Sequence, residues 1–486
     1  MKKIVHAFVV LSLLFSINPN THAQNNPNKG VLFTTSSNEA LSFFTDGLKY
    51  YDLGENTRAR EYLQKAIKQD PAFASAYIYL ATMAPTQQEF VVDLDKAKEN
   101  ISAANQWEKL LYNYTETYLT DNTEKRLAVA QTMTTTFPTS ARACVYLGQA
   151  YENRNDFINA RKCFQKAVSL EPKWPGGYMA LTNSYLFEDP KDFKQAEKIA
   201  NQLVGIVPTG STYILLGDTY RAQNNLKSAE EMYTKALDDQ SPSGYYKRGH
   251  VLSLEGQYDK ARQDYEKAGS LDIIPTAASQ FKANTYLFDG EPEKALESLQ
   301  NDIEKIAPTL DGSNSNQFKL DLLTSAALIA IHTQNAEKLD ELIKMAQPIS
   351  EDIGNRAGTT EAKLAQKSSM LYLQAMLQAI KNDLTGAVQT AEEIKTTMEP
   401  VNNPLKLDGY DFILGYVAMQ QKDFAKAVSH FEKTNKLDVY NQYWLAKAYE
   451  AAGKNDNANV IYKYLSNYNF NNLGFALVRN DVKKKM

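Results

Sequence analysis

One spacing constrains this chain more than any other feature of its sequence. The same order of residue types returns about every 34 residues. Large apolar, small and aromatic residues recur at three- and four-residue intervals and a proline closes several of the units, as in Cys144, Leu147, Gly148, Tyr151, Ala160, Phe164, Ala167 and Pro172. Intervals of three and four predict amphipathic helices, and the proline ends the second helix of a unit. The spacing therefore predicts an array of helical hairpins.

The units are not equally regular along the chain. The first is set by Gly47, Ala59 and Pro71, and the pattern returns near the end with Leu445, Ala446, Tyr449, Ala458 and Tyr462. Two stretches interrupt it, one over 309–316 that is rich in Gly, Ser and Asn, and an apparent insertion over 348–360. We expect a flexible lead-in over 24–38, an N-terminal array over 39–308 that is most regular over 141–299, a loop over 309–316, a C-terminal array over 317–468, and a capping helix with a basic tail over 469–486.

The recurring small residues have a packing role. A Gly or Ala at the eighth position and an Ala at the twentieth let the two helices of a unit approach closely. Gly54, Gly256 and Gly453 lie where a first helix ends, which suits the left-handed conformation that closes helices.

The order Leu-Gly-x2-Tyr, then Ala-x3-Phe and Pro resembles the tetratricopeptide repeat (TPR) from about Ala40 to Leu465, although Trp is lacking at the fourth position. The resemblance implies an all-α, right-handed superhelical solenoid of about 10 to 11 TPR-like hairpins. It also implies a protein that acts by presenting a surface to a partner protein or peptide.

The N-terminus has the layout of a secretory signal. Lys2 and Lys3 precede an apolar run from Ile4 to Phe15. Thr21 and Ala23 are the small residues at the −3 and −1 positions of the expected cleavage site. The alternative is an uncleaved anchor, but the run is short of the roughly 20 residues that span a bilayer. We expect a signal peptide over 1–23, cleavage after Ala23, no transmembrane segment in the mature chain, and an exported bacterial protein of the periplasm or the exterior.

The charge balance excludes one class of partner. The chain has 53 basic and 57 acidic residues, and cleavage would remove two lysines. No basic field for nucleic acid is present. Lys483, Lys484 and Lys485 are interpreted as a solvated tail.

Cys144 and Cys163 are the only cysteines and fall in one unit. In an antiparallel helical pair their positions nearly face, so a disulfide could form in an oxidising compartment. The other interpretation is a pair of free thiols, because Cys is also a common small core residue.

A search for catalytic residues is empty. No nucleophile elbow, phosphate loop or zinc-protease motif is present, and His250, His332 and His430 fall in different hairpins. We expect no enzyme, no cofactor and no metal site. A hydrolase with its site in the irregular segments is the weakest alternative.

The resemblance implies that the inner face of the superhelix carries the partner site. The ninth positions there form a polar row, Gln149, Asn183, Asp218, His250 and Asn284, and the fifth positions include Met179 and Tyr246. Amide side chains donate and accept at once and could hold an extended peptide. The alternative is an inner face that is polar only because it is solvated.

A second, aromatic face is expected in the C-terminal array, from Tyr372, Phe412, Tyr416, Tyr440 and Tyr443. Such rings could stack on sugars, or could be packing between units. Together these features predict a non-enzymatic scaffold or adaptor of the cell envelope that binds a partner segment along its concave face. The alternative is a peptide- or glycan-capturing component of a nutrient uptake system.

Overall fold

The computed structural model describes residues 31–239, 242–356 and 358–486, which form 25 α-helices, three short 3-10 helices and no strand. The expected signal peptide over 1–23, its cleavage position and the start of the lead-in lie outside the described residues. Twenty-four of the helices form twelve consecutive antiparallel pairs and α25 follows them. Ten or eleven pairs were expected.

The first six pairs are α1 (Asn38–Asp52) and α2 (Asn56–Gln69), α3 (Ala74–Thr82) and α4 (Gln87–Asn100), α5 (Gln106–Glu116) and α6 (Thr123–Thr136), α7 (Ala141–Glu152) and α8 (Phe157–Leu170), α9 (Pro175–Phe187) and α10 (Phe193–Ile206), and α11 (Gly210–Ala222) and α12 (Leu226–Lys235). The next six are α13 (Pro242–Leu254) and α14 (Tyr258–Gly269), α15 (Thr276–Phe288) and α16 (Pro292–Ile306), α17 (Gly312–His332) and α18 (Ala336–Arg356), α19 (Thr360–Ile380) and α20 (Leu384–Met398), α21 (Asp408–Gln420) and α22 (Phe424–Phe431), and α23 (Val439–Ala451) and α24 (Asn455–Ser466). The last helix is α25 (Leu473–Lys485).

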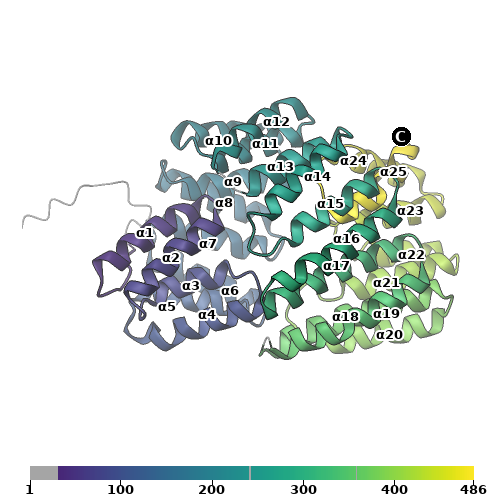
Figure 1. Cartoon of the computed structure of the whole chain (residues 1–486), viewed down its shortest axis with the longest axis horizontal. Helices are drawn as coiled ribbons and strands as arrows, with labels where there is room; N and C mark the ends of the chain where they lie inside the picture. Colours follow the sequence, from purple (N-terminus) through teal and green to yellow (C-terminus); the bar gives the residue numbers. More distant parts are fainter. Residues whose placement is uncertain (1–30, 240–241, 357) are drawn as a thin grey trace, which may run out of the picture.

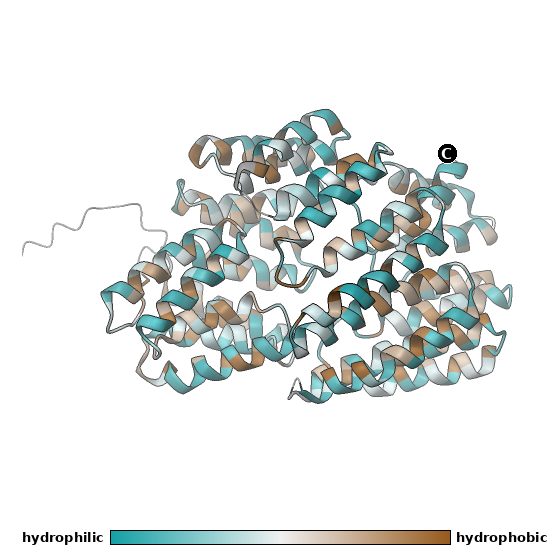
Figure 2. Ribbon diagram, in the orientation of Figure 1, coloured by the Kyte–Doolittle hydropathy of each residue, from teal (hydrophilic) through white to brown (hydrophobic). Residues whose placement is uncertain are grey.

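Neighbouring pairs lie side by side and the chain coils as it proceeds (Figure 1). Most helices carry both hydrophobic and hydrophilic residues along their length (Figure 2). The coil brings distant parts of the chain together, since α25 contacts α15, α17, α23 and α24. The C-terminal helix is therefore not an end cap alone, because it also packs on the middle of the array.

The eighth-position glycines set the distance within a pair. A Cβ built on Gly148 would lie 2.2 Å from the Phe164 ring, and one on Gly217 would lie 2.5 Å from Tyr233. A Cβ built on Gly47 would lie 3.3 Å from the backbone oxygen of Ala59, the residue at the twentieth position of its unit. The absent side chain is thus what lets each aromatic ring lie against its partner helix.

The hairpin turns use the left-handed conformation, as the sequence predicted. Gly54, Gly256 and Gly453 have φ of 74°, 80° and 74°. Asn155 and Asn224 occupy the same place in other units with φ of 58° and 61°, and Asn tolerates this region better than most residues.

The structure corrects three expectations about irregular segments. The loop over 309–316 is mostly helix, because α17 starts at Gly312 and the Asp311 side chain caps it by accepting from the Asn314 amide. Pro348 lies inside α18 and does not mark an insertion there. Residues 31–37 of the lead-in make specific contacts, including hydrogen bonds from Thr34 to Glu108 at 3.0 Å and from Ser36 to Asp70 at 3.2 Å.

A buried ion pair closes the first turn of the coil. Arg142 of α7 donates to both oxygens of Asp52 on α1 at 2.8 and 2.7 Å, although the two residues are 90 positions apart. The indole of Trp174 donates to the same carboxylate at 2.7 Å. Asp52 and Arg142 are both buried, so α1 is fixed against the fourth and fifth pairs.

Candidate partner-binding face

The predicted polar row comes from five successive first helices, α7, α9, α11, α13 and α15, with one residue on each. The structure divides this row in two. Gln149 is half-buried and Asn183 is exposed, and the described residues give neither side chain a hydrogen-bond partner. Asp218, His250 and Asn284 are 4%, 5% and 1% exposed. The row therefore has an open end on α7 and α9 and a covered end on α11 to α15.

The cover is part of the same chain. Residues 467–472, which we call the strap, connect α24 to α25 and are not helical. The side-chain amide of Asn471 lies in the row: its Nδ2 donates to the Tyr265 hydroxyl at 3.2 Å and is 3.4 Å from His250 Nδ1. Its Oδ1 accepts from Asn284 Nδ2 at 3.3 Å. Two of the five predicted residues thus contact one asparagine from the end of the chain.

The strap crosses several units. The Phe470 ring lies edge-on to Phe187 of α9, with centroids 5.0 Å apart, and 4.5 Å from the Arg221 guanidinium of α11. Asn469 donates to Asn224, beyond α11, at 3.0 Å. These contacts run from α9 to the turn after α11 and, through Asn471, reach α15.

Helix α25 continues the same line. Arg479 donates to the backbone oxygen of Leu254 at the end of α13, at 2.9 Å. Asn480 donates to the backbone oxygens of Leu287 and Phe288 at the end of α15, at 3.1 and 3.2 Å. The strap and α25 together cover the ends of the first helices from α9 to α15.

A charged network lies under the strap. Asp218 accepts from the Tyr233 hydroxyl at 2.7 Å, from Lys247 at 2.8 Å and from Arg221 at 3.0 Å. Burial alone would raise the pKa of Asp218, but Lys247 and Arg221 outweigh it and hold that pKa below its ordinary value. Asp218 is thus a structural anion of this network and not a free hydrogen-bonding group.

His250 is held neutral in the same place. Burial, followed by the nearby charges of Arg221 and Lys247, lowers the pKa of His250 well below its ordinary value. Arg221 itself is 2% exposed, and its Nε and Nη1 have no hydrogen-bond partner among the described residues. The covered end of the row therefore carries an excess of positive charge, and two buried N–H donors of Arg221 there lack a hydrogen-bond acceptor among the described residues.

The fifth-position residues have separate surroundings. Met179 is half-buried on α9. Tyr246 is half-buried, its hydroxyl donates to the Asp272 carboxylate, and its ring packs on Phe281 with centroids 5.7 Å apart. Tyr246 is thus engaged within its own and the following unit.

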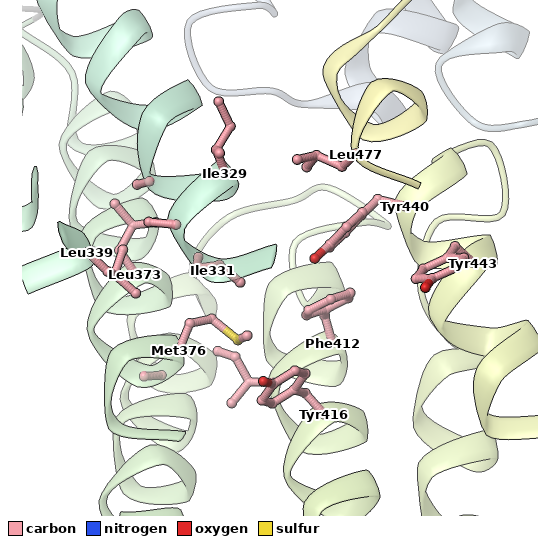
Figure 3. Packing of buried hydrophobic residues seen from close by; sticks show 14 of the residues in the cluster. Ile329, Ile331, Leu339, Leu373, Met376, Phe412, Tyr416, Tyr440, Tyr443 and Leu477 are labelled. Carbon is pink, nitrogen blue, oxygen red and sulfur yellow. The ribbon is translucent and has the colours of Figure 1, made fainter. Parts of the chain in front are cut away.

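The aromatic face expected in the C-terminal array is not an open platform. Phe412, Tyr416, Tyr440 and Tyr443 are between 2% and 7% exposed. Figure 3 shows Tyr440, Phe412 and Tyr416 following one another beside Ile331 and Met376. These rings belong to a core that extends from α15 to α25. Tyr372 is half-buried, with its ring centroid 6.0 Å from that of Phe412. The coil folds this face inward, so the rings pack between units.

The cysteines are free thiols, so the disulfide considered from the sequence is not formed. Burial, followed by the proximity of Cys144, raises the pKa of Cys163 to about 11. Cys144 is buried in the core around Phe164 and Leu181. The position of Cys144 is explained by packing.

His332 and His430 each lie beside neighbouring side chains of the fold. His332 Nδ1 is 3.3 Å from the Tyr440 hydroxyl, and His430 Nδ1 is 2.8 Å from Asp411. Over the ranges that the structure describes, no group of three or more His, Cys, Asp and Glu could hold a metal ion. In those same ranges no helix has the length and apolar character needed to cross a membrane.

Comparison with known families agrees with the helical pairs. Three family models, each described as tetratricopeptide repeat, match residues 45–98, 141–174, and 210–238 with 242–272. Those segments are tetratricopeptide repeats, and the fold is an all-α superhelical TPR solenoid.

Individual relatives are distant. The chain is 23% identical over 330 residues to the human protein O-mannosyl-transferase TMTC3, across 61% of the chain and 35% of that protein. It is 25% identical over 217 residues to superkiller protein 3 of Schizosaccharomyces pombe, across 41% of the chain and 15% of that protein. The crystal structure of yeast Tom70 is 14% identical, with a TM-score of 0.43, over 87% of the chain and 90% of Tom70. The chain thus spans about a third or less of the two curated relatives.

The strap was missed at the level of sequence. Its signal was an asparagine-rich stretch between two predicted helices, Asn467, Asn469, Asn471 and Asn472. Such composition ordinarily predicts a loop. Only the coil of the array shows that this loop lies on the predicted face.

Proposed function

We propose that this protein is a non-enzymatic scaffold of the cell envelope that binds an extended segment of a partner protein along the first helices α7 to α15. TPR proteins commonly mediate protein–protein interaction, and the matched repeat segments over 141–174, 210–238 and 242–272 contain α7, α11 and α13 of this face. The observation that carries the proposal is the strap. A non-helical segment already lies on this face and contacts two side chains of the predicted row, His250 and Asn284.

The open end of the row is where a partner would first make contact. Gln149 and Asn183 are accessible amides on adjacent first helices, and half-buried Met179 lies one turn away from Asn183 on α9. Amides accept and donate to a peptide backbone, while a thioether adapts to different apolar side chains.

The compartment in this proposal rests on residues 1–23, whose composition is that of an export signal. Uptake of peptides or glycans is the other candidate function. Glycan capture would require exposed aromatic rings. Phe412, Tyr416, Tyr440 and Tyr443 are buried and have no free face for a sugar. We therefore favour the scaffold.

The test is affinity purification from an envelope fraction. The chain carrying Gln149→Ala and Asn183→Ala should lose, by about tenfold or more, a protein that the native chain captures. The matched control is Gln131→Ala with Gln195→Ala, which removes two exposed amides from the second helices α6 and α10. Capture of the same proteins by all three chains would contradict the proposal.

A further inference from the structure

The strap occupies its site as a ligand would. Its contacts are with side chains of α9, α11, α13, α14 and α15 and with Asn224, which is 245 residues away from Asn469 in the sequence. Asn471 is bound through both atoms of its amide, while Asn467, Tyr468, Asn469 and Phe470 remain exposed or half-exposed. The segment that follows is different, because Phe475 and Val478 of α25 are buried in the core. The strap could therefore leave the face while α25 stays in place.

The fit of the strap is incomplete at one point. The Phe470 ring covers the Arg221 guanidinium but provides no hydrogen-bond acceptor, and Nε and Nη1 of Arg221 lack a partner among the described residues. A buried donor without an acceptor is unfavourable. A ligand with an oxygen acceptor at the position of Phe470 would satisfy Arg221 better than the strap does.

The local charge favours an anionic acceptor. Beneath the strap, Arg221 and Lys247 are paired with the single carboxylate of Asp218, and His250 is neutral. One positive charge is therefore in excess in a site from which water is largely excluded. Charge-assisted hydrogen bonds from a guanidinium to a carboxylate are the strong ones, and Nε and Nη1 of Arg221 are the donors without a partner among the described residues.

We infer that the covered end of the row is a binding site for an extended partner segment in which an acidic residue precedes an asparagine, and that the strap is an internal ligand that holds this site until such a segment displaces it. The carboxylate pairs with Arg221 and the asparagine takes the place of Asn471 between His250, Tyr265 and Asn284. This inference rests on the proposed function and names its partner chemistry. The strap is tethered at both ends, so its effective concentration at the face is on the order of millimolar and the native chain binds weak ligands poorly.

The experiment uses the full chain with Phe470→Ala and Asn471→Ala, which frees the site and leaves α25 unchanged. Two labelled peptides are titrated, one with the sequence of residues 467–474 and one with Glu in place of its phenylalanine. The Glu peptide is expected to bind the freed chain at least about tenfold more tightly than the native peptide, and more tightly than it binds the native chain. Adding Arg221→Lys, which keeps the charge but loses the Nε and Nη1 donors of the guanidinium, should remove most of that preference.

Equal binding of the two peptides, a preference that survives Arg221→Lys, or no binding by a freed chain of native helicity would each overturn the inference. A second measurement applies even if the freed chain unfolds. In the intact chain, Phe470→Glu should unfold at a higher temperature than Phe470→Gln, and the reverse order would overturn the carboxylate assignment. The peptide experiments could fail while Gln149→Ala with Asn183→Ala still abolishes partner capture. That outcome would reject the inference about the strap and leave the proposed scaffold function supported, so the two proposals are tested separately.

Discussion

At the scale of residues, the repeat is explained by pairs of a small residue and a ring. Gly148, Gly217 and Gly249 each lie against the ring of the residue sixteen positions later, with 2.2 to 2.6 Å between a built Cβ and that ring. A methyl group there must displace an aromatic side chain that is itself fully buried, such as Phe164 or Tyr233. The glycine is thus required by packing and not by backbone conformation.

Gly148→Ala should lower the free energy of unfolding by about 1–3 kcal/mol, because overpacking a tight core forces rings from their rotamers. Gly205→Ala is the matched control, since Gly205 is also helical, within α10, and nothing lies within 4 Å of its built Cβ. The control should be neutral or stabilising by up to about 1 kcal/mol. Chemical denaturation of both variants measures this, and equal effects would contradict the packing argument.

A pair of glutamates gives a pH dependence. Burial, followed by a hydrogen bond to Glu188, raises the pKa of Glu152 to about 9, and burial also raises the pKa of Glu188. Between about pH 4.5 and pH 9 the folded chain keeps a proton at Glu152 that the unfolded chain has released. Folding is therefore linked to proton uptake, and stability falls as the pH rises through this window.

Glu152→Gln should reduce the loss of stability with rising pH, because the glutamine amide donates to Glu188 without taking up a proton. The variant should be more stable than the native chain at pH 8.5 and close to it at pH 4.5, as measured by denaturation across that range. Glu61→Gln, at an exposed glutamate of α2, is the control. Parallel stability curves for Glu152→Gln and the native chain would contradict the assignment.

At the scale of elements, a buried ion pair joins the two ends of the first turn of the coil. Asp52 joins α1 to α7 through Arg142 and to the start of α9 through Trp174. Breaking a buried pair leaves an uncompensated charge, which costs more than the pair contributes.

Asp52→Asn should therefore destabilise the chain by about 3–5 kcal/mol. Asp46→Asn removes a carboxylate of the same helix whose partner, Lys49, is exposed, and should change stability by less than about 1 kcal/mol. Thermal unfolding of the two variants measures the difference. Similar midpoints would show that the Asp52 pair does not fix α1.

The sequence predicted those elements whose cause is local. The 34-residue spacing predicted the helical pairs, and Gly54, Gly256 and Gly453 were correctly placed in left-handed turns. The loop over 309–316 was wrong because Asp311 caps a helix that Gly, Ser and Asn can begin. The contacts of Asp52 and Asn471 could not be predicted, because they join residues 90 to 221 positions apart and depend on the pitch of the coil.

At the scale of the whole molecule, two contacts join distant parts of the coil in addition to those near Asp52. Asn403, after α20, donates to Asp121 between α5 and α6, and a groove of about 450 Å³ lies beside this contact, lined by Tyr118, Gln366 and Leu405. The strap and α25 make the second contact, across α9 to α15. The array is thus a coil whose inner face is partly occupied by its own end.

The proposed compartment makes a prediction for the intact chain. When the protein is expressed in a Gram-negative host, its mature form should begin at Gln24 and appear in the periplasmic or extracellular fraction. Intact mass and N-terminal sequencing measure this. A chain that retains Met1 in the cytoplasm would contradict the export proposal and leave the binding face unaffected.

Cross-linking tests the position of the strap most directly. Asn224→Cys and Asn469→Cys are introduced into a chain with Cys144→Ser and Cys163→Ser, and a short bismaleimide is added to dilute protein. Because these asparagines are in contact at 3.0 Å, an intramolecular link between 224 and 469 should form in most molecules, fall sharply with Phe470→Ala and Asn471→Ala, and be absent from each single-cysteine chain. No link in a natively helical chain, or links only between chains, would contradict a strap that lies across α9 to α15.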